Sequence, residues 1–312
     1  MRITRLFPAL LAIGALLAGD VLGAQSQELS MPGFPKPGAP PVVTLLAPGA
    51  APRKAIRYAV TANQKSAMDM TTTVSMAMNL GGMAMPMDMP TTKLSIDLGV
   101  TNITPGGDIT YNIAFTGMTI DEVGGGNPAL TAAFQQAAAT ITSTKGTATV
   151  SNRGLPKSST LDVSDPAIKQ MLTAMVASIE NLAVPFPEEA IGIGGRWEVR
   201  QVMTNGGQTS FQKTEYEVVS IEGLTVSLKM KSEQTGPPQT IPNPILPGTD
   251  INLESLTGTS TGTVVIRLDS LVPTSEVQAK SSTVMSMSLG GQAQSIATEM
   301  TSKLTVAPSK GK

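Results

Sequence analysis

The 312-residue sequence contains no histidine and no cysteine. Histidine is the side chain that enzymes use most often as a general acid or base, and cysteine supplies thiolate nucleophiles, disulfides and many zinc sites. Serine, lysine, tyrosine and carboxylates remain, but their spacing forms no recognisable catalytic set. We therefore expect a protein without catalytic residues or cofactors, held together by packing alone.

Aromatic residues and charges are also scarce, at 3% and 14% of the chain, and the formal net charge is −1. Proteins that bind nucleic acid present a basic patch, which a chain with this balance of charge lacks. Nucleic acid is therefore excluded as an expected partner. The hydrophobic residues, at 41% of a chain this long, are sufficient for a sizeable core.

The N-terminus has the pattern of a secretory signal peptide. Arg2 and Arg5 precede an uncharged apolar run at 6–18, which is too short to span a bilayer. We predict a signal peptide at 1–24, cleavage just before Gln25, and a mature protein that is periplasmic or extracellular, soluble and not an integral membrane protein. Because no cysteine follows the apolar run, we expect no lipid anchor.

Seven prolines lie between residues 25 and 53, among glycine and alanine. Proline at this density favours extended polyproline conformation and removes backbone donors, so this segment is expected to be a Pro-rich linker. The apolar residues 42–46 could already dock on the folded part. The rest is expected to form a single β-rich domain at 54–308, followed by a short tail at 309–312.

Beyond residue 54, apolar and polar residues alternate with a period of two, which is typical of half-buried strands. The alternating segments are 55–60, 94–98, 109–115, 197–202, 215–221, 224–230, 264–268 and 303–306. Two stretches, 128–139 and 165–182, instead repeat apolar residues at helical spacing. The pattern predicts a mainly β (α+β) fold, a large curved antiparallel sheet or half-barrel packed against two amphipathic helices.

A short sequence is repeated within the chain. Met-x-Met-x-Leu-Gly-Gly occurs at 76–82 and again at 285–291, and similar residues follow at 92–96 and at 302–306 with one residue of slippage. Two adjacent glycines between alternating segments favour a tight hairpin turn. The repeat therefore predicts a duplicated β-hairpin at 74–98 and 283–306.

Methionine is concentrated in the first of these hairpins. Eight methionines lie between Met68 and Met89, and Met83, Met85, Met87 and Met89 alternate strictly, so on a strand they share one face. Thioethers are soft ligands that suit Cu(I). Methionine also fills irregular apolar surfaces, and the second hairpin carries glutamine at two of the matching positions. We favour packing or an apolar cavity over a metal site.

The junction at 182–197 has the sequence Leu-Ala-Val-Pro-Phe-Pro-Glu-Glu-Ala-Ile-Gly-Ile-Gly-Gly-Arg-Trp. Together with the stretch from Leu45 through Tyr58, it resembles a family of exported bacterial β-rich proteins of unknown function. The order of strands and helices is also distantly similar to the lipoprotein carriers LolA and LolB. That resemblance implies a curved half-barrel that wraps helices around an apolar cavity, and it carries over no catalytic positions.

Three functions follow as hypotheses. The first is a non-catalytic exported protein that binds an apolar or amphipathic small molecule, such as a lipid, between sheet and helices. The second is Cu(I) binding by Met83, Met85, Met87 and Met89. The third is a structural envelope protein whose sheet edges or linker engage an envelope partner. The ligand-binding residues expected for the first hypothesis are Met76, Met78, Met85, Met87, Leu172, Met175, Met285 and Met287.

Overall fold

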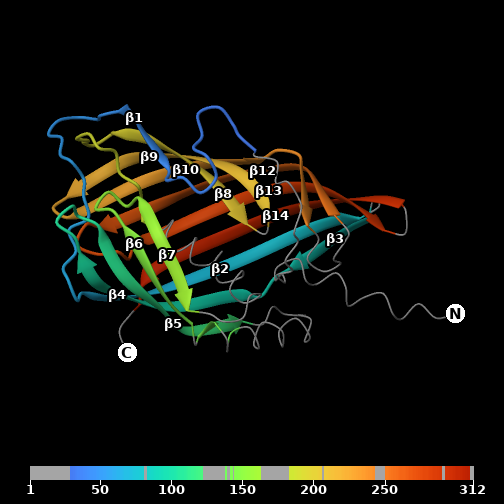
Figure 1. Cartoon of the computed structure of the whole chain (residues 1–312), viewed down its shortest axis with the longest axis horizontal. Coiled ribbons are helices and arrows are strands. Elements are labelled where there is room, and N and C mark those ends of the chain that lie inside the picture. The colour runs from blue at the N-terminus through green and yellow to red at the C-terminus, as the bar shows by residue number, and fades with distance from the viewer. Residues whose placement is uncertain are drawn as a thin grey trace.

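The computed structural model describes residues 29–80, 83–121, 144–162, 183–205, 207–242, 250–289 and 292–309, with positions 138, 141 and 142. These residues form 14 strands in one antiparallel sheet, so the expected mainly β fold is confirmed (Figure 1). The predicted signal peptide, Leu172 and Met175 lie outside the described residues. So do the two predicted helices, apart from position 138.

The strands follow one another with short connections in several places and long ones in others. In chain order they are β1 (Val42–Ala47), β2 (Lys65–Leu80), β3 (Met83–Asp88), β4 (Thr91–Ile103), β5 (Ile109–Asp121), β6 (Lys145–Val150), β7 (Pro156–Asp162), β8 (Arg196–Asn205), β9 (Gln208–Glu222), β10 (Thr225–Gly236), β11 (Gln239–Pro242), β12 (Asp250–Arg267), β13 (Thr274–Leu289) and β14 (Gln292–Pro308).

The spatial order of the sheet differs from the chain order. It runs β1-β8-β9-β10-β12-β13-β14-β2-β4-β5-β6-β7, with β11 beside β12 and β3 beside β2. Among the described strands, β1 and β7 are the two edges and do not pair with each other, so the sheet is open. Long strands from the two ends of the chain thus lie side by side in the middle (Figure 1).

One face of the sheet carries the hydrophobic core, and we call it the inner face. Trp197 and Val218 from one flank belong to the same buried cluster as Ile113 and Val150 from the other flank. A single core that joins both flanks requires the sheet to curve around it. We call the opposite side the outer face.

Chain connections close one end of the curved sheet, which we call the closed end. Tyr58, Phe186, Trp197 and Tyr216 form a row of aromatic rings there, with successive centroids 5.6, 5.9 and 5.4 Å apart. Two of these rings also form hydrogen bonds with the backbone. Trp197 donates its indole N–H to the carbonyl oxygen of Pro185 at 2.8 Å, and the Tyr58 hydroxyl accepts the backbone N–H of Val184 at 3.1 Å.

The strand predicted at 55–60 is wrong. Its alternation is real, because Ile56, Tyr58 and Val60 are buried, but the segment pairs with no single neighbour. Tyr58 donates its backbone N–H to Asn152, whereas Ala59 donates to Leu268. Burial of every second residue indicates an extended backbone. A β-strand must in addition be hydrogen-bonded along its length to one neighbouring strand. The other predicted strands coincide, to within one residue, with parts of β4, β5, β8, β9, β10, β12 and β14.

Each copy of the repeated sequence forms a hairpin at the end of the sheet away from the closed end. Leu80 pairs with Met83 and Leu289 pairs with Gln292, so the cross-strand pairing extends equally far in both copies. Between β3 and β4 the strand opposite β2 gains one residue near Met89, whereas β13 and β14 pair without irregularity.

The segment expected as a linker packs against the sheet in its described part. β1 is an edge strand hydrogen-bonded to β8. Before it, Phe34 contacts the outer-face residue Phe211 with ring centroids 5.3 Å apart, and the Arg200 guanidinium lies 5.7 Å from the Phe34 ring. The prolines therefore stiffen a strap that covers part of the outer face rather than a spacer.

Candidate ligand-binding face

Charged side chains are partitioned between the two faces of the sheet. On β9, for example, Lys213, Glu215 and Glu217 point outward, and Thr214 and Tyr216 between them point inward with the core. The cross-strand pairing shows the same separation across the whole sheet, from the edge strand β1 to the edge strand β7. Among the described residues, no Lys, Arg, Asp or Glu that is paired with a residue of a neighbouring strand lies on the inner face.

The methionines predicted as ligand-binding residues gather on the inner face of β2 and β3. Met76 pairs with Met87, and Met78 pairs with Met85, while Met300 of β14 pairs with Met76 from the other side. Directly opposed residues of an antiparallel pair have Cβ atoms about 5 Å apart, so these side chains are neighbours on one face. We call Met76, Met78, Met85, Met87 and Met300 the methionine flank.

Burial differs from one methionine to the next. Met78 is 3% exposed, whereas its partner Met85 is 36% exposed and Met83, next to the turn, is 70% exposed. The methionine flank therefore combines a buried side chain with accessible apolar surface. Flexible thioether side chains can adapt such a surface to the shape of a ligand.

The other predicted ligand-binding methionines lie two strands away. Met285 and Met287 belong to β13, which is separated from β2 by β14. Met285 packs against a separate small cluster formed by Ile241, Leu253 and Leu256. The structure thus brings together four of the eight predicted residues directly and places two more on the same face. Leu172 and Met175 lie outside the described residues.

The four methionines of the copper hypothesis do not form one regular array. Met83, Met85 and Met87 share a face of β3, whereas Met89 follows the end of that strand and donates its backbone N–H to Val74. Within the described residues, no group of three or more His, Cys, Asp or Glu side chains is placed to hold a metal ion.

Opposite the methionine flank, the inner face carries a chain of hydrogen-bonded polar side chains on β8, β9 and β10. Gln201 donates to the amide oxygen of Gln212 at 2.9 Å, and Gln212 donates to the hydroxyl oxygen of Ser232 at 3.0 Å. Thr214 also donates to Ser232, which donates in turn to the backbone carbonyl of Lys213. We call Gln201, Gln212, Thr214 and Ser232 the polar ladder.

Ser232 and Thr214 of the polar ladder are buried, at 2% and 5% exposure, whereas Gln201 and Gln212 are half-buried. Buried polar groups need hydrogen-bond partners, and the residues of the polar ladder find theirs in one another, across three neighbouring strands. Gln234 extends the polar surface by donating to the Ser210 hydroxyl at 2.9 Å. Sequence reasoning missed these residues because Phe211 between them looks like the inward position, whereas it faces outward beneath Phe34.

One cross-strand row connects the polar ladder to the methionine flank. Small residues occupy its centre, on β12 and β13. The row crosses eight neighbouring strands and contains, in spatial order, Gln201, Gln212, Gln234, Gly258, Ser281, Met300, Met76 and Met87.

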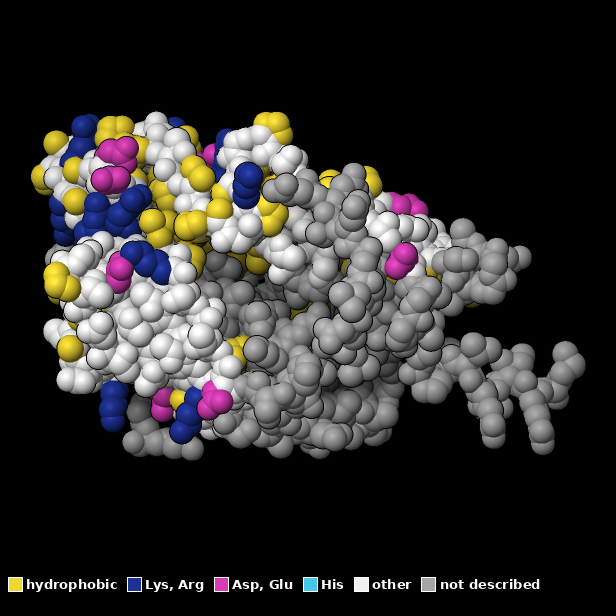
Figure 2. All heavy atoms as spheres, viewed as in Figure 1, with side chains coloured by type: hydrophobic (Ala, Val, Ile, Leu, Met, Phe, Trp, Pro, Cys, Tyr) yellow, Lys and Arg dark blue, Asp and Glu magenta, His cyan; other side chains and the backbone are white. Residues whose placement is uncertain are grey.

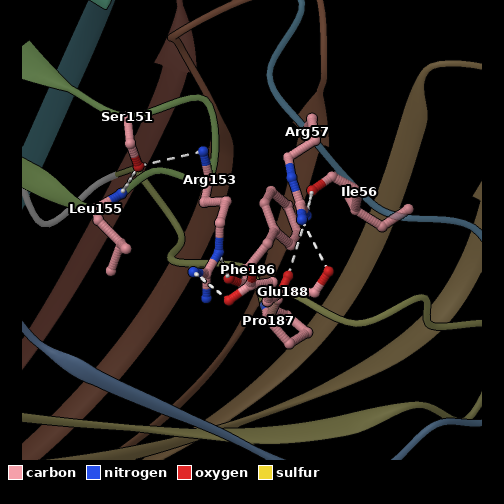
Figure 3. A network of polar contacts seen from close by, with 8 residues as sticks. All are labelled: Ile56, Arg57, Ser151, Arg153, Leu155, Phe186, Pro187 and Glu188. Atoms are coloured by element: carbon pink, nitrogen blue, oxygen red, sulfur yellow. Dashed lines mark hydrogen bonds and ion pairs between the residues drawn. The ribbon is translucent and has the colours of Figure 1, made fainter. Parts of the chain in front are cut away.

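Two arginines hold the closed end together (Figure 3). The Arg57 guanidinium donates to the backbone carbonyls of Ile56, Pro187 and Glu188 at 2.7 to 3.0 Å. Arg153 donates to the carbonyl of Phe186 at 3.0 Å. Burial, followed by the neighbouring positive charge of Arg153, lowers the pKa of Arg57. These contacts satisfy backbone carbonyls of the connector before β8, so the arginines are structural.

Much of the charge visible on the surface lies at the closed end. Figure 2 shows basic side chains gathered there, at the left of the view. The outer face also carries two adjoining shallow hollows of about 380 and 390 Å³, which share Asn112 and Ala114. Most of their lining residues point away from the core, so the hollows are separate from the inner face.

Comparisons with known proteins identify no family. No protein-family description and no curated protein sequence matches the chain. An outer membrane channel from Pseudomonas putida F1 is similar at 8% sequence identity, over 80% of this chain and 98% of that chain, with a TM-score of 0.14. A score that low carries no argument about fold or function. None of the described helical positions belongs to a helix long and apolar enough to cross a membrane.

Proposed function

We propose that this chain is a non-catalytic exported protein that binds an apolar or amphipathic ligand, such as a lipid, on the inner face of its sheet. The methionine flank carries the proposal, because it is a partly exposed apolar surface on the same face of the sheet as the core. Covering about 200 Å² of such surface would contribute about 5 kcal/mol to binding.

The carrier resemblance supports the same function by analogy only. The described residues that carry the family resemblance, at 45–58 and 183–197, lie at the closed end rather than in the methionine flank. They therefore account for the shape of the protein and leave ligand choice to the inner face. Export follows from the predicted signal peptide at 1–24.

The test is binding of Nile red, an uncharged dye whose fluorescence rises in apolar surroundings, to the purified mature protein. Met76→Lys places a charge within the methionine flank, and the matched control Ala77→Lys places it on the outer face of the same strand. We expect wild type and Ala77→Lys to bind the dye and Met76→Lys to lose binding while keeping its circular dichroism spectrum. Equal binding by all three proteins would refute the proposal.

Cu(I) binding is the second candidate, favoured by the pairs Met76–Met87 and Met78–Met85. These pairs place neutral soft ligands on adjacent strands, although no side-chain anion among the described strand residues lies on the inner face to balance the charge of the metal. Competition with a Cu(I) chelator tests this candidate. Replacement of Met83, Met85, Met87 and Met89 by leucine should abolish the competition, and an unchanged titration would end the hypothesis.

A further inference from the structure

The cross-strand row from Gln201 to Met87 changes from amide side chains to thioethers across the inner face. From this change we infer that the ligand is an uncharged amphiphile, whose hydroxyl- or amide-bearing head group contacts the polar ladder while its apolar part covers the methionine flank. The inference rests on the proposed function and specifies its ligand class.

The absence of charge on the described inner face selects against ionic head groups. A carboxylate, phosphate or ammonium moved from water to this wall would lose hydration and find no opposite charge. That loss costs several kcal/mol per ion even after relaxation, about a hundredfold or more in affinity. For a neutral head group, the free-energy cost is limited to the hydrogen bonds with water that the protein does not replace.

The hydrogen bonds within the polar ladder leave a donor and an acceptor at its start. Gln201 uses one of its two amide N–H groups on Gln212, and among the described residues its second N–H and its Oε1 have no other partner. A hydroxyl or an amide can donate and accept at once, as this pairing requires. A carboxylate can only accept, and an ammonium can only donate.

The dimensions of the row suit such a ligand. Neighbouring strands are about 4.8 Å apart, so a row across eight strands extends about 34 Å along the sheet. One acyl chain spans about half of a hydrocarbon layer that is about 30 Å thick, which leaves room for a head group at the glutamine end. The small residues Gly258 and Ser281 lie between the two ends, so no large side chain of this row separates the glutamine end from the methionine end.

Displacement of Nile red by three ligands of equal chain length tests the inference. These are 1-monopalmitoylglycerol, which is neutral with two hydroxyls, methyl palmitate, which is neutral without a donor, and palmitate at about pH 8, which is anionic. We expect monopalmitoylglycerol to displace the dye at a concentration at least about tenfold below that of palmitate. Equal or better displacement by palmitate would overturn the inference while leaving the proposed function intact.

Substitutions in the polar ladder and beside it test whether this part of the inner face binds the head group. Gln201→Leu should lower the affinity for monopalmitoylglycerol by about tenfold and leave the affinity for methyl palmitate unchanged, since only monopalmitoylglycerol loses hydrogen bonds. Gln278→Leu, an exposed outer-face substitution, is the control and should change neither ligand. Gln234→Leu provides a second variant if Gln201→Leu fails to fold. Equal weakening of both ligands by the glutamine variants would contradict the head-group assignment, whereas failure of Nile red itself to bind would refute the proposed function.

Discussion

Gln201 and Met87 stand at opposite ends of one cross-strand row on the inner face of the sheet, linked through six intervening residues on adjacent strands. The change from amide to thioether occurs without a charged side chain in between. A core built only for stability would place apolar residues along the whole row. The glutamines are retained at one end, which is the arrangement expected of a wall that orients an amphiphile.

The first prediction concerns the indole N–H of Trp197, which binds the carbonyl oxygen of Pro185 at the closed end. Trp197→Phe removes that donor and leaves a buried acceptor and a small cavity, so we expect a loss of about 3 kcal/mol in the free energy of unfolding. Urea denaturation followed by circular dichroism measures it.

Tyr216→Phe is the matched control for that variant. Tyr216 stacks on Trp197, and its hydroxyl has no hydrogen-bond partner among the described residues. Burial raises the pKa of that hydroxyl, and its removal should change the free energy of unfolding by less than about 0.5 kcal/mol. Equal losses for the two variants would show that the Trp197 hydrogen bond contributes little to stability.

The second prediction compares two glycines that both have left-handed backbone conformation. Gly49 has φ +75°, and an added Cβ would lie 2.5 Å from the carbonyl oxygen of Gly192. Gly38 has φ +78° and nothing within 4 Å of the same position. We expect Gly38→Ala to cost about 1 kcal/mol from backbone strain, and Gly49→Ala to cost at least about 3 kcal/mol because the backbone must also move. Similar melting temperatures for both variants would contradict the packing of these two segments.

The third prediction concerns stability in acid. A hydrogen bond from Lys213, followed by one from Lys231, lowers the pKa of Glu233, and a hydrogen bond from Arg267 lowers the pKa of Asp269. Carboxylates with lowered pKa in the folded state stabilise it above their unfolded pKa, and this contribution is lost as the pH falls below about 4. Both groups are partly exposed, so the loss is modest.

Melting temperatures measured from about pH 7 to about pH 3 test this dependence. The double variant Glu233→Gln and Asp269→Asn should lose part of the acid sensitivity of the wild type. With no histidine in the chain, no side chain of ordinary pKa titrates between about pH 5 and 8, and a flat stability profile is expected there. Acid sensitivity equal to that of the wild type would show that these two ion pairs contribute nothing.

The fourth prediction concerns the pH dependence of fatty-acid binding. If only the protonated acid fits the uncharged inner face, the apparent affinity for palmitate should rise by about tenfold per pH unit as the pH falls from about 8 to about 6. Monopalmitoylglycerol should bind equally at every pH in that range, and added salt should affect neither ligand much. Palmitate affinity that weakens on acidification would instead indicate binding of the anion.

Strand positions were predictable where alternation coincides with β-branched and aromatic residues, as in β4, β5 and β8. Long parts of β12 and β13 escaped prediction because their inward positions carry glycine, serine and alanine, which leave almost no contrast of polarity between the faces. The failed strand at 55–60 shows the opposite limit, since burial of alternate residues does not specify a hydrogen-bonding partner.

The candidate site was predictable only in its apolar half. Alternation placed Met85 and Met87 on one face, and the register of the hairpin then brought them against Met78 and Met76. The polar ladder could not be found in the same way, because inward glutamine reverses the usual relation between polarity and burial. Its recognition needed the cross-strand pairing of β8, β9 and β10, which joins residues distant in sequence.

Native mass spectrometry of the protein purified from its own host in detergent-free buffer tests the central claim most directly. We predict that a fraction of the molecules carries an added mass in the range of a lipid, and that the released compound is an uncharged amphiphile. Met76→Lys, expressed in the same host, should be recovered without the added mass. Wild-type protein that is uniformly free of added mass, or that releases an anionic lipid, would contradict the account.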